Sequence, residues 1–509
     1  MANTTRRTFL VGSAVAGASV AAGSRLQRLE AAEPNPLRIP EIIDARRQAN
    51  GITLKAQEGR TPFFTGRESA TRGFNGSYLG PTLRLHRGDE VEVSVTNDMR
   101  DATAVHWHGL LVPAEADGGP HQMIQPGATW RPRLAVDQPA ATLWYHAHPH
   151  GVTARQVYGG LAGMIILADD AERALGLPSE YGVDDLPVIL QDKVFSEGRL
   201  LYPESPMTIM TGQRGDTVLA NGTRNAVARV PAGLVRLRLL NGSNARVYDL
   251  SFSDGRAFHW IATDGGLLER PVERRSLWLA PGQRAEILVD LSDGRAVALR
   301  TDLDPTLRAG MMRMMGGAGE PLDGPTTVVR LEPQAGTPSP KRAIPERLVE
   351  PERLDSARAV RRRELRLTMG MGGMMGRGGM MGGMGPGMGR GMMGGGMGSF
   401  GIDGRAFDMD RIDQTVRLGD TEIWQVSSEM MIHPFHMHGV HFQVLSRAGS
   451  RPAINDSGPR DTVLVQEPVE ILVRFTQRAA SAPFMFHCHT LEHEDAGMMG
   501  QYKTSDQAI

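Results

Sequence analysis

Short stretches in which apolar and polar residues alternate recur along the whole chain, and they constrain the fold more than any other feature. The stretches are Glu90–Val95, Gly233–Leu240, Arg284–Leu291 and Glu470–Phe475. A period of two sends successive side chains to opposite faces of a β-strand, so each stretch predicts a strand. Glycine, proline, asparagine and aspartate separate the stretches, as expected for turns. We therefore predict an all-β protein built from antiparallel sandwiches.

Three segments of the chain share one loose plan, which predicts three similar β-sandwich domains. In each segment a strand leads into a short turn, and an alternating strand follows it. The turns have the sequences RGD, PAG and RLGD at residues 87–89, 231–233 and 417–420. A length of 509 residues allows about three domains of roughly 150 residues each. The predicted domains are residues 33–175, 176–335 and 364–509.

Two segments interrupt this pattern. Residues 336–363 mix proline, serine and alanine with a charge cluster at 358–363, and we interpret them as an interdomain linker. Residues 369–398 are almost entirely methionine and glycine. Because glycine at that density disfavours a helix, these residues predict a loop inserted in the third domain.

The first 32 residues are predicted to contain a twin-arginine signal peptide, and the sequence leaves cleavage after Ala18, Ala22 or Ala32 open. Arg6 and Arg7 precede an apolar run of small residues, Val11–Gly23. Twin-arginine signals are addresses read by a receptor, not anchors, and the run is too short for a confident membrane span. We therefore expect export to the periplasm or out of the cell, with no stable membrane anchor.

The charge and cysteine content narrow the choice of partners. The chain has 56 basic and 57 acidic residues, so electrostatics make no case for a nucleic-acid partner. Its single cysteine, Cys488, excludes an internal disulfide. We expect a monomer that acts on small molecules.

Cys488 lies between two histidines, His487 and His489. In a strand, the cysteine points one way and the two histidines point the other way. A thiolate, two imidazoles and a weak thioether form the ligand set of an electron-transfer copper. Cys488, His433, His493 and Met498 supply such a set, with the two histidines beside Cys488 free to bind other metal ions behind it.

Four His-x-His pairs occur in a chain with 15 histidines. The pairs are His106 with His108, His146 with His148, His436 with His438, and His487 with His489. One pair is a weak signal, because a structural histidine is commoner than a ligand. Eight imidazoles suit three copper ions, with two on one ion and three on each of the others. Because two pairs lie in the first predicted domain and two in the third, the cluster should bridge these domains.

These four motifs, in this order, resemble the copper signatures of the multicopper oxidase family. The resemblance covers nearly the whole chain after the signal and includes Val188–Lys193 and Leu239–Arg246. Together with the insert rich in methionine, it is most similar to bacterial cuprous oxidases and laccase-like enzymes. It implies three cupredoxin-like Greek-key sandwiches and four copper ions: one type 1, one type 2 and two type 3. A further substrate or regulatory copper is also implied.

The resemblance implies a role for each motif residue. The type 1 copper would take His433, Cys488, His493 and Met498. The type 2 copper would take His106 and His436. One type 3 copper would take His108, His146 and His489, and the other would take His148, His438 and His487. Asp117 and Glu494 match the acids that supply protons during O₂ reduction in relatives. The alternative is that they are a turn aspartate and a surface glutamate.

The substrate site is implied by Met369, Glu429 and Met431, because soft thioethers prefer Cu(I) and carboxylates suit the departing Cu(II). The expected function is oxidation of Cu(I), and also of phenolic donors, coupled to reduction of O₂ to water in periplasmic copper tolerance. The alternatives are a general laccase acting on phenols or Mn(II), and a non-catalytic copper carrier.

Overall fold

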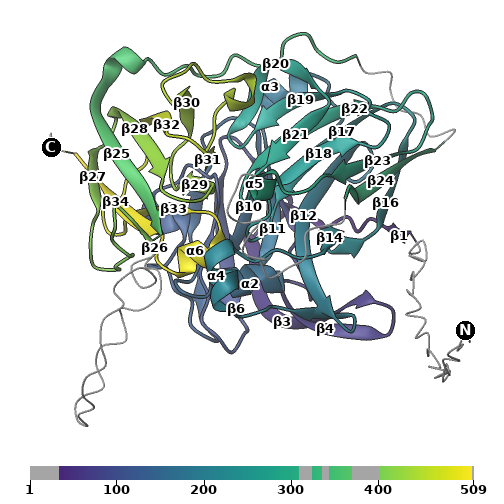
Figure 1. Cartoon of the computed structure of the whole chain (residues 1–509), viewed down its shortest axis with the longest axis horizontal. Helices are drawn as coiled ribbons and strands as arrows, with labels where there is room; N and C mark the ends of the chain where they lie inside the picture. Colours follow the sequence, from purple (N-terminus) through teal and green to yellow (C-terminus); the bar gives the residue numbers. More distant parts are fainter. Residues whose placement is uncertain (1–33, 309–323, 335–342, 370–399, 507–509) are drawn as a thin grey trace, which may run out of the picture. The chain divides into compact units, whose positions relative to one another are not determined.

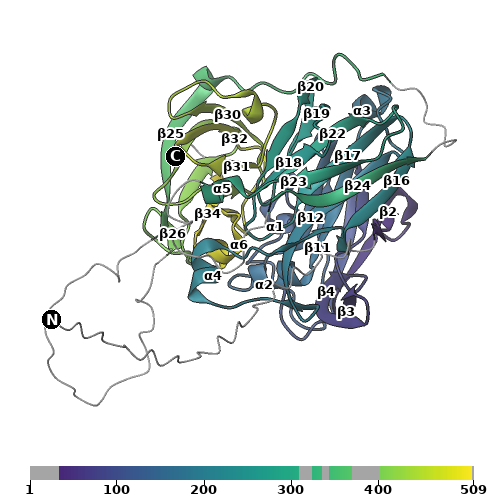
Figure 2. The same cartoon turned by 45° about the vertical axis from the view of Figure 1, so that its right-hand side comes forward.

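The computed structural model describes residues 34–308, 324–334, 343–369 and 400–506 (Figure 1). The predicted signal peptide, and the insert 369–398 apart from Met369, lie outside these residues. Three modules follow one another along the chain, and each consists of two β-sheets (Figures 1 and 2). The all-β class is confirmed, although crossover connections also bring parallel neighbours into the sheets, as between β12 and β17. Within the described residues, no helix is both long and apolar enough to cross a membrane.

The two sheets of the first module enclose one apolar core, formed by side chains such as Leu54, Val93 and Leu143. The order β2-β5-β11-β10-β7 comprises Ile42–Asp44, Thr82–His86, Ala162–Ala168, Ala141–Ala147 and Val105–His106. The order β4-β3-β6-β8, with β9 also paired to β6, comprises Arg67–Phe74, Ile52–Phe64, Glu90–Asn97, Thr129–Trp130 and Arg133–Ala135. The helices are η1 (Ala45–Arg47), α1 (Ala114–Asp117), α2 (Thr153–Gly159) and α3 (Asp170–Ala174).

The second module has the larger sheets. The order β1-β16-β24-β23-β18-β21 comprises Asn35–Pro36, Ala226–Pro231, Thr326–Gln334, Val297–Thr301, Tyr248–Phe252 and Ser276–Leu279. The order β15-β14-β12-β17-β22-β19-β20, with β13 paired to β12, comprises Thr223–Arg224, Thr217–Ala220, Asp185–Ser196, Leu234–Asn241, Arg284–Asp290, Phe258–Thr263, Gly266–Arg274 and Arg199–Leu201. Its helices are α4 (Pro206–Thr211) and α5 (Pro305–Arg308).

The third module carries the stretch with the single cysteine. The order β26-β25-β28-β32-β30 comprises Phe400–Ile402, Ala359–Met369, Thr421–Ser428, Val469–Arg474 and Phe442–Arg447. The order β27-β34-β33-β29-β31 comprises Gln414–Arg417, Met499–Ser505, Phe484–Cys488, His433–Met437 and Thr462–Val465. Its helices are η3 (Ser356–Arg358), η4 (Ile454–Asp456) and α6 (Leu491–Asp495).

Two strand pairings cross the predicted domain boundaries. Asn35, predicted to open the first domain, aligns with Ala226 in a sheet of the second module. The predicted linker 336–363 overlaps β25, which begins at Ala359 and pairs with β28. The arginines at the end of the predicted linker lie in this strand. Acids on neighbouring strands pair with them, as Glu422 does with Arg363.

The alternation at 233–240 does form a strand, β17, but both faces of β17 are buried. Its polar face carries Arg236 and Arg238, which pair with Glu286 on β22 and with Glu172 of the first module. The alternating polar residues therefore mark a contact between modules rather than a solvated face.

Candidate metal centre

Twelve side chains named by the sequence motifs come together in two adjoining groups, and all twelve are buried. They lie on or directly after β7, β10, β29 and β33, on α6, and just before β34. Strand pairing aligns them: His146 with His106 between β10 and β7, and His436 with His487 between β29 and β33. The first and third modules therefore supply the histidines jointly, as the distribution of the four pairs predicts.

The smaller group surrounds Cys488. Its Sγ lies 3.3 Å from Nδ1 of His433 and 3.7 Å from Nδ1 of His493. The backbone N–H of Cys488 donates to the carbonyl of Met498, which holds that buried residue beside the group. The imidazole Nε2–H of His493 donates to the carbonyl of Met210, so Nδ1 is the nitrogen that faces the sulfur. Burial raises the pKa of the Cys488 thiol to about 12, so a thiolate here needs a cation beside it.

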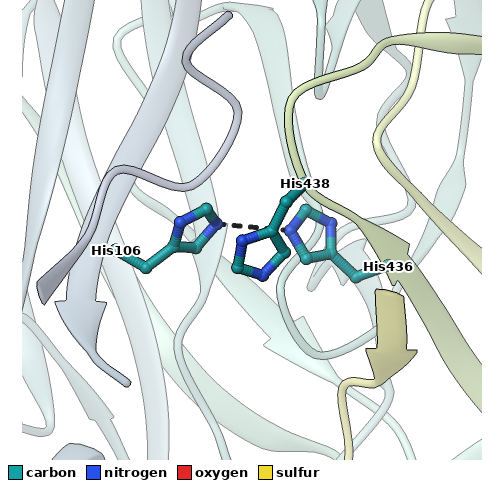
Figure 3. Close-up of side chains that lie close together, drawn as sticks. All are labelled: His106, His436 and His438. Carbon is teal, nitrogen blue, oxygen red and sulfur yellow. Dashed lines mark hydrogen bonds between the residues drawn. The ribbon is translucent and has the colours of Figure 1, made fainter. Parts of the chain in front are cut away.

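The larger group contains eight imidazoles. Nε2 of His487 lies 3.2 Å from Nε2 of His438 and 3.3 Å from Nε2 of His148. Nε2 of His436 lies 3.4 Å from Nε2 of His106, and Figure 3 shows His438 between these two rings. These distances bring together Nε2 atoms from all four His-x-His pairs, two of the first module and two of the third.

The remaining three rings of this group are His108, His146 and His489. Their ring centroids lie 5.1 to 5.7 Å apart. Nδ1 of His108 and Nε2 of His146 and His489 are buried without a hydrogen-bond partner among the described residues. A buried ring nitrogen without a partner is costly, and each of these is free to offer a lone pair.

The hydrogen bonds and the low pKa values of the rings fit a metal centre. His106, His146, His436 and His487 each donate Nδ1–H to a backbone carbonyl, which leaves Nε2 as an acceptor toward the cluster. Burial lowers the pKa of His433 and His148 to about 3 and that of His436 to about 4. These three rings are therefore neutral at neutral pH, which is the form that binds metal ions.

Both acids expected to supply protons lie against this group. Asp117 Oδ2 accepts from Nδ1 of His438 at 2.7 Å. Burial raises the pKa of Asp117, against the opposing effect of His106. Glu494 lies 3.2 Å from Nδ1 of His487 and 3.6 Å from Nδ1 of His148. Burial opposes ionisation of Glu494, but His148 and His487 lower its pKa well below its usual value. Both acids are buried, so the alternative of a turn aspartate and a surface glutamate is wrong in its placement of Glu494.

Sequence reasoning missed a third acid, Asp461, and its partner Arg284. Asp461 Oδ1 accepts from Nε2 of His108 at 3.0 Å, and its carbonyl accepts from Nδ1 of His436 at 2.9 Å. Burial opposes its ionisation, but Arg284 and His108 hold its pKa well below the usual value. Neither residue belongs to a motif, and Arg284 comes from the second module, so no local signal in the sequence indicates them.

The residues expected to bind a substrate ion lie at the ends of two neighbouring strands of the third module. β25 and β28 run parallel, with Leu367 aligned with Ser428. Met369 is the last residue of β25, and Met431 follows the end of the neighbouring β28; both are half-buried. Glu429 pairs with Arg366 at 3.3 Å, an ion pair that the sequence did not predict.

Five histidines outside the motifs belong to none of the candidate metal-binding groups among the described residues. They are His86, His121, His150, His259 and His441. His441, for example, donates Nε2–H to the carbonyl of Gly109.

Comparison with known proteins places the whole chain in one family. Family models described as "Multicopper oxidase" match residues 55–172 and 387–508. The multicopper oxidase mco of Staphylococcus aureus is 35% identical over 483 residues, which cover 92% of this chain and 93% of that protein. The cell division protein FtsP of a Rahnella strain is 38% identical over 499 residues, which cover 97% and 98% of the two chains.

Solved structures agree with this placement. A bacterial laccase-like multi-copper oxidase, CueO from an Ochrobactrum strain, superimposes with a TM-score of 0.81 at 38% sequence identity. The match covers 92% of this chain and 100% of that one. That enzyme is described as having oxidase activity towards lignin model compounds and lignosulfonate. On these grounds the chain is an oxidoreductase of three cupredoxin-like sandwiches, and it belongs to the multicopper oxidase family.

Proposed function

We propose that this protein oxidises Cu(I) one electron at a time and couples the oxidation to the reduction of O₂ to water. The observation that carries the proposal is the placement of the side chains at residues 487 and 488. Sγ of Cys488 faces His433 and His493, whereas Nε2 of His487 faces His148 and His438. One peptide unit thus joins an electron-accepting group to the eight-imidazole group.

We assign the type 1 copper to the group around the cysteine and the other three coppers to the eight imidazoles. The type 1 ligands are His433, Cys488, His493 and Met498. The type 2 ligands are His106 and His436. The type 3 ligands are His108, His146 and His489 for one ion and His148, His438 and His487 for the other. Bound copper would supply one-electron redox chemistry at the cysteine and the site of O₂ reduction at the imidazoles.

The protein's own groups account for the remaining requirements. Buried neutral imidazoles present lone pairs without competing protons. Asp117 accepts a hydrogen bond from the ring of His438, and Glu494 lies 3.2 Å from Nδ1 of His487; these two acids are the groups that deliver protons to the reduced oxygen. Burial of the cluster excludes bulk water from this proton transfer.

We propose that Cu(I) binds at Met369, Glu429 and Met431, beside the type 1 ligands. Thioethers bind the soft cuprous ion, and a carboxylate favours release of the harder cupric ion. Met431 lies two residues before His433, so an electron has a short path from the bound substrate ion to the thiolate site. Arg366 competes for Glu429, which weakens this site at rest.

Phenolic donors are the second candidate. The oxidase activity of the Ochrobactrum relative towards lignin model compounds favours them. A general laccase would act on phenols or Mn(II), whereas a copper carrier would bind copper without turnover. The FtsP relatives match this chain over the same length, so overall similarity does not choose between these functions. The complete set of histidine and cysteine ligands favours catalysis.

We further propose that the enzyme works in the periplasm, reached by the twin-arginine route, where converting Cu(I) to the less membrane-permeant Cu(II) protects the cell. The test is O₂ consumption with Cu(I) as the sole donor, measured beside a phenol series with and without excess Cu(II). A cuprous oxidase consumes O₂ with Cu(I) alone. Turnover of phenols without turnover of Cu(I) would favour the laccase, and copper binding without O₂ consumption would favour the carrier.

A further inference from the structure

Arg284 opens strand β22 of the second module and is fully buried where the three modules meet. Its guanidinium donates to carbonyls of Thr142 in the first module and of Asp264 and Gly282 in the second. Toward the third module it forms a two-point ion pair with Asp461, at 2.9 Å and 2.5 Å. Every nitrogen of this guanidinium is thus bonded, and the planar fork has one available orientation.

Asp461, held in place by Arg284, in turn accepts hydrogen bonds from two histidines of the cluster. Its Oδ1 accepts from Nε2 of His108 at 3.0 Å, and its backbone carbonyl accepts from Nδ1 of His436 at 2.9 Å. The hydroxyl of Thr462 donates to the same Oδ1 at 2.8 Å. The rings of His108 and His436 stack with centroids 3.7 Å apart and planes 15° apart.

These bonds select a different nitrogen on each ring. A neutral imidazole has one N–H and one lone pair, so a ring that donates through Nε2 offers Nδ1. His108 donates through Nε2, and its buried Nδ1 has no hydrogen-bond partner among the described residues. His436 donates through Nδ1, and its Nε2 faces His106. The opposite choices follow from the position of one residue, Asp461.

The backbone next to His108 is shaped to admit this ion pair. Gly109 has φ +90°, and a Cβ added there would lie 2.6 Å from Nη2 of Arg284 and 2.8 Å from Oδ2 of Asp461. A side chain at residue 109 would therefore displace the ion pair. Gly282, two residues before Arg284, similarly leaves no room for a Cβ, which would lie 2.8 Å from the ring of His489. The second module thus forms one wall of the cluster although it supplies none of the proposed ligands.

We propose that Arg284 is a positioning residue, which acts through Asp461 to fix the ring orientation and the metal-facing nitrogen of His108 and His436. The inference rests on the proposed function, because these rings are assigned to a type 3 and the type 2 copper. Loss of groups that orient metal-binding histidines typically weakens metal affinity on the order of 10–100-fold. Arg284 therefore controls copper binding at the cluster, and a change confined to Arg284 should leave the type 1 site intact.

The test is Arg284→Lys in the copper-loaded full chain, because lysine keeps the charge but cannot make the two-point contact. The readouts are copper per protein, the electron paramagnetic resonance spectrum of the type 2 copper, the absorption of the type 3 pair and the blue absorption of the type 1 copper. The expected result is an altered type 2 spectrum and cluster copper bound 10–100-fold more weakly, with the blue absorption kept. The matched control is Arg236→Lys, which keeps the charge but loses the two-nitrogen contact of another buried arginine of the second module with Glu286, away from the cluster.

An Arg284→Lys protein with the wild-type type 2 and type 3 signals would overturn the inference. If Arg284→Lys also loses the blue absorption and the protein unfolds, Asp461→Asn decides, because the amide keeps the shape but loses the charge. The amide variant should then show the altered type 2 spectrum with the blue absorption intact, and wild-type spectra from it would overturn the inference. Failure of the copper assignment looks different, because the wild-type protein itself would then bind no type 2 or type 3 copper. Failure of Cu(I) oxidation alone would show in the wild-type donor assay and would leave the spectroscopic effect of Arg284→Lys in place.

Discussion

Cys488 and His487 are consecutive residues at the end of β33, yet their side chains belong to different groups. Sγ of Cys488 lies 3.3 Å from Nδ1 of His433, and Nε2 of His487 lies 3.2 Å from Nε2 of His438. The alternation of a β-strand sends neighbouring side chains to opposite faces, and here that alternation spans the border between the two groups. An electron that arrives at the sulfur has a covalent route of one peptide unit to the eight imidazoles.

Removing the proton-transfer acids should slow O₂ reduction without affecting the cysteine site. Glu494 contacts His487 and His148, and an amide there cannot exchange a proton. We expect Glu494→Gln and Asp117→Asn each to slow reoxidation of the reduced enzyme by on the order of 100-fold. Rapid mixing of reduced enzyme with O₂ measures this rate, and the blue absorption should be unchanged.

The matched control for these variants is Asp456→Asn. Asp456 is a buried acid of the third module, like Glu494, and it pairs with Arg447 away from the imidazoles. It should reoxidise at the wild-type rate. Unchanged reoxidation in both Glu494→Gln and Asp117→Asn would remove these acids from the proton path.

Deleting the insert 369–398 should separate the two classes of donor. Under the proposed function, the methionines of the insert would supply thioethers for Cu(I), whereas a phenol would need only access to the type 1 site. We expect the deletion variant to lose Cu(I) turnover and to oxidise bulky phenols faster than the full chain. Steady-state kinetics with both donors measure this, and an equal loss of both activities would contradict a role for the insert in Cu(I) oxidation.

Met431 should contribute to Cu(I) binding rather than to the electron path. Leucine has a similar volume but lacks the sulfur, so Met431→Leu removes a soft ligand and little packing. We expect KM for Cu(I) to rise roughly tenfold, equivalent to about 1.4 kcal/mol of binding free energy. KM for a phenol should not change. The control is Met430→Leu, since Met430 is exposed next to Met431. An equal effect of both variants would count against a specific ligand at 431.

The buried Lys193 should make the protein more stable as the pH rises. Burial lowers its pKa to about 7, although Asp192 and Glu492 oppose the shift. The unfolded chain, with a lysine pKa of about 10.4, binds more protons than the folded protein between about pH 7 and pH 10. The free energy of unfolding therefore gains up to about 1.4 kcal/mol per pH unit from this residue in that window. Denaturant unfolding at several pH values gives the free energy of unfolding as a function of pH. Between about pH 7 and pH 10 this free energy should rise less steeply with pH in Lys193→Met than in the wild type. Lys55→Met, at an exposed lysine, should keep the wild-type pH dependence of the free energy of unfolding. The prediction would be contradicted if Lys193→Met also kept it.

Local sequence was sufficient to predict the groups around Cys488 and the eight imidazoles. Two histidines separated by one residue lie on the same face of an extended chain, so the spacing alone predicts that both imidazoles of a His-x-His pair face the same way. The same reasoning predicted β6, β17, β22 and β32 from alternation. Pairing between the first and third modules followed from the count of imidazoles rather than from any structural signal.

Contacts between distant segments could not be predicted in this way. Arg284 and Asp461 are 177 residues apart, and each looks like an ordinary charged residue in a β-rich segment. The arginines at 361–363 read as a linker because their acidic partners lie on other strands, such as Glu422 on β28. Likewise, nothing in Asn35 indicates its partner in the second module. Such residues show their role only when the modules are assembled.

The most direct test of the central claim is Cys488→Ser, assayed for O₂ consumption with Cu(I) as the donor. A hydroxyl cannot serve as the thiolate ligand, so the blue absorption should vanish and O₂ consumption should fall to the level of the copper-free protein. The type 2 copper signal should persist, because the eight imidazoles remain in place. A serine variant that consumed O₂ at the wild-type rate would contradict electron transfer from residue 488 to the cluster.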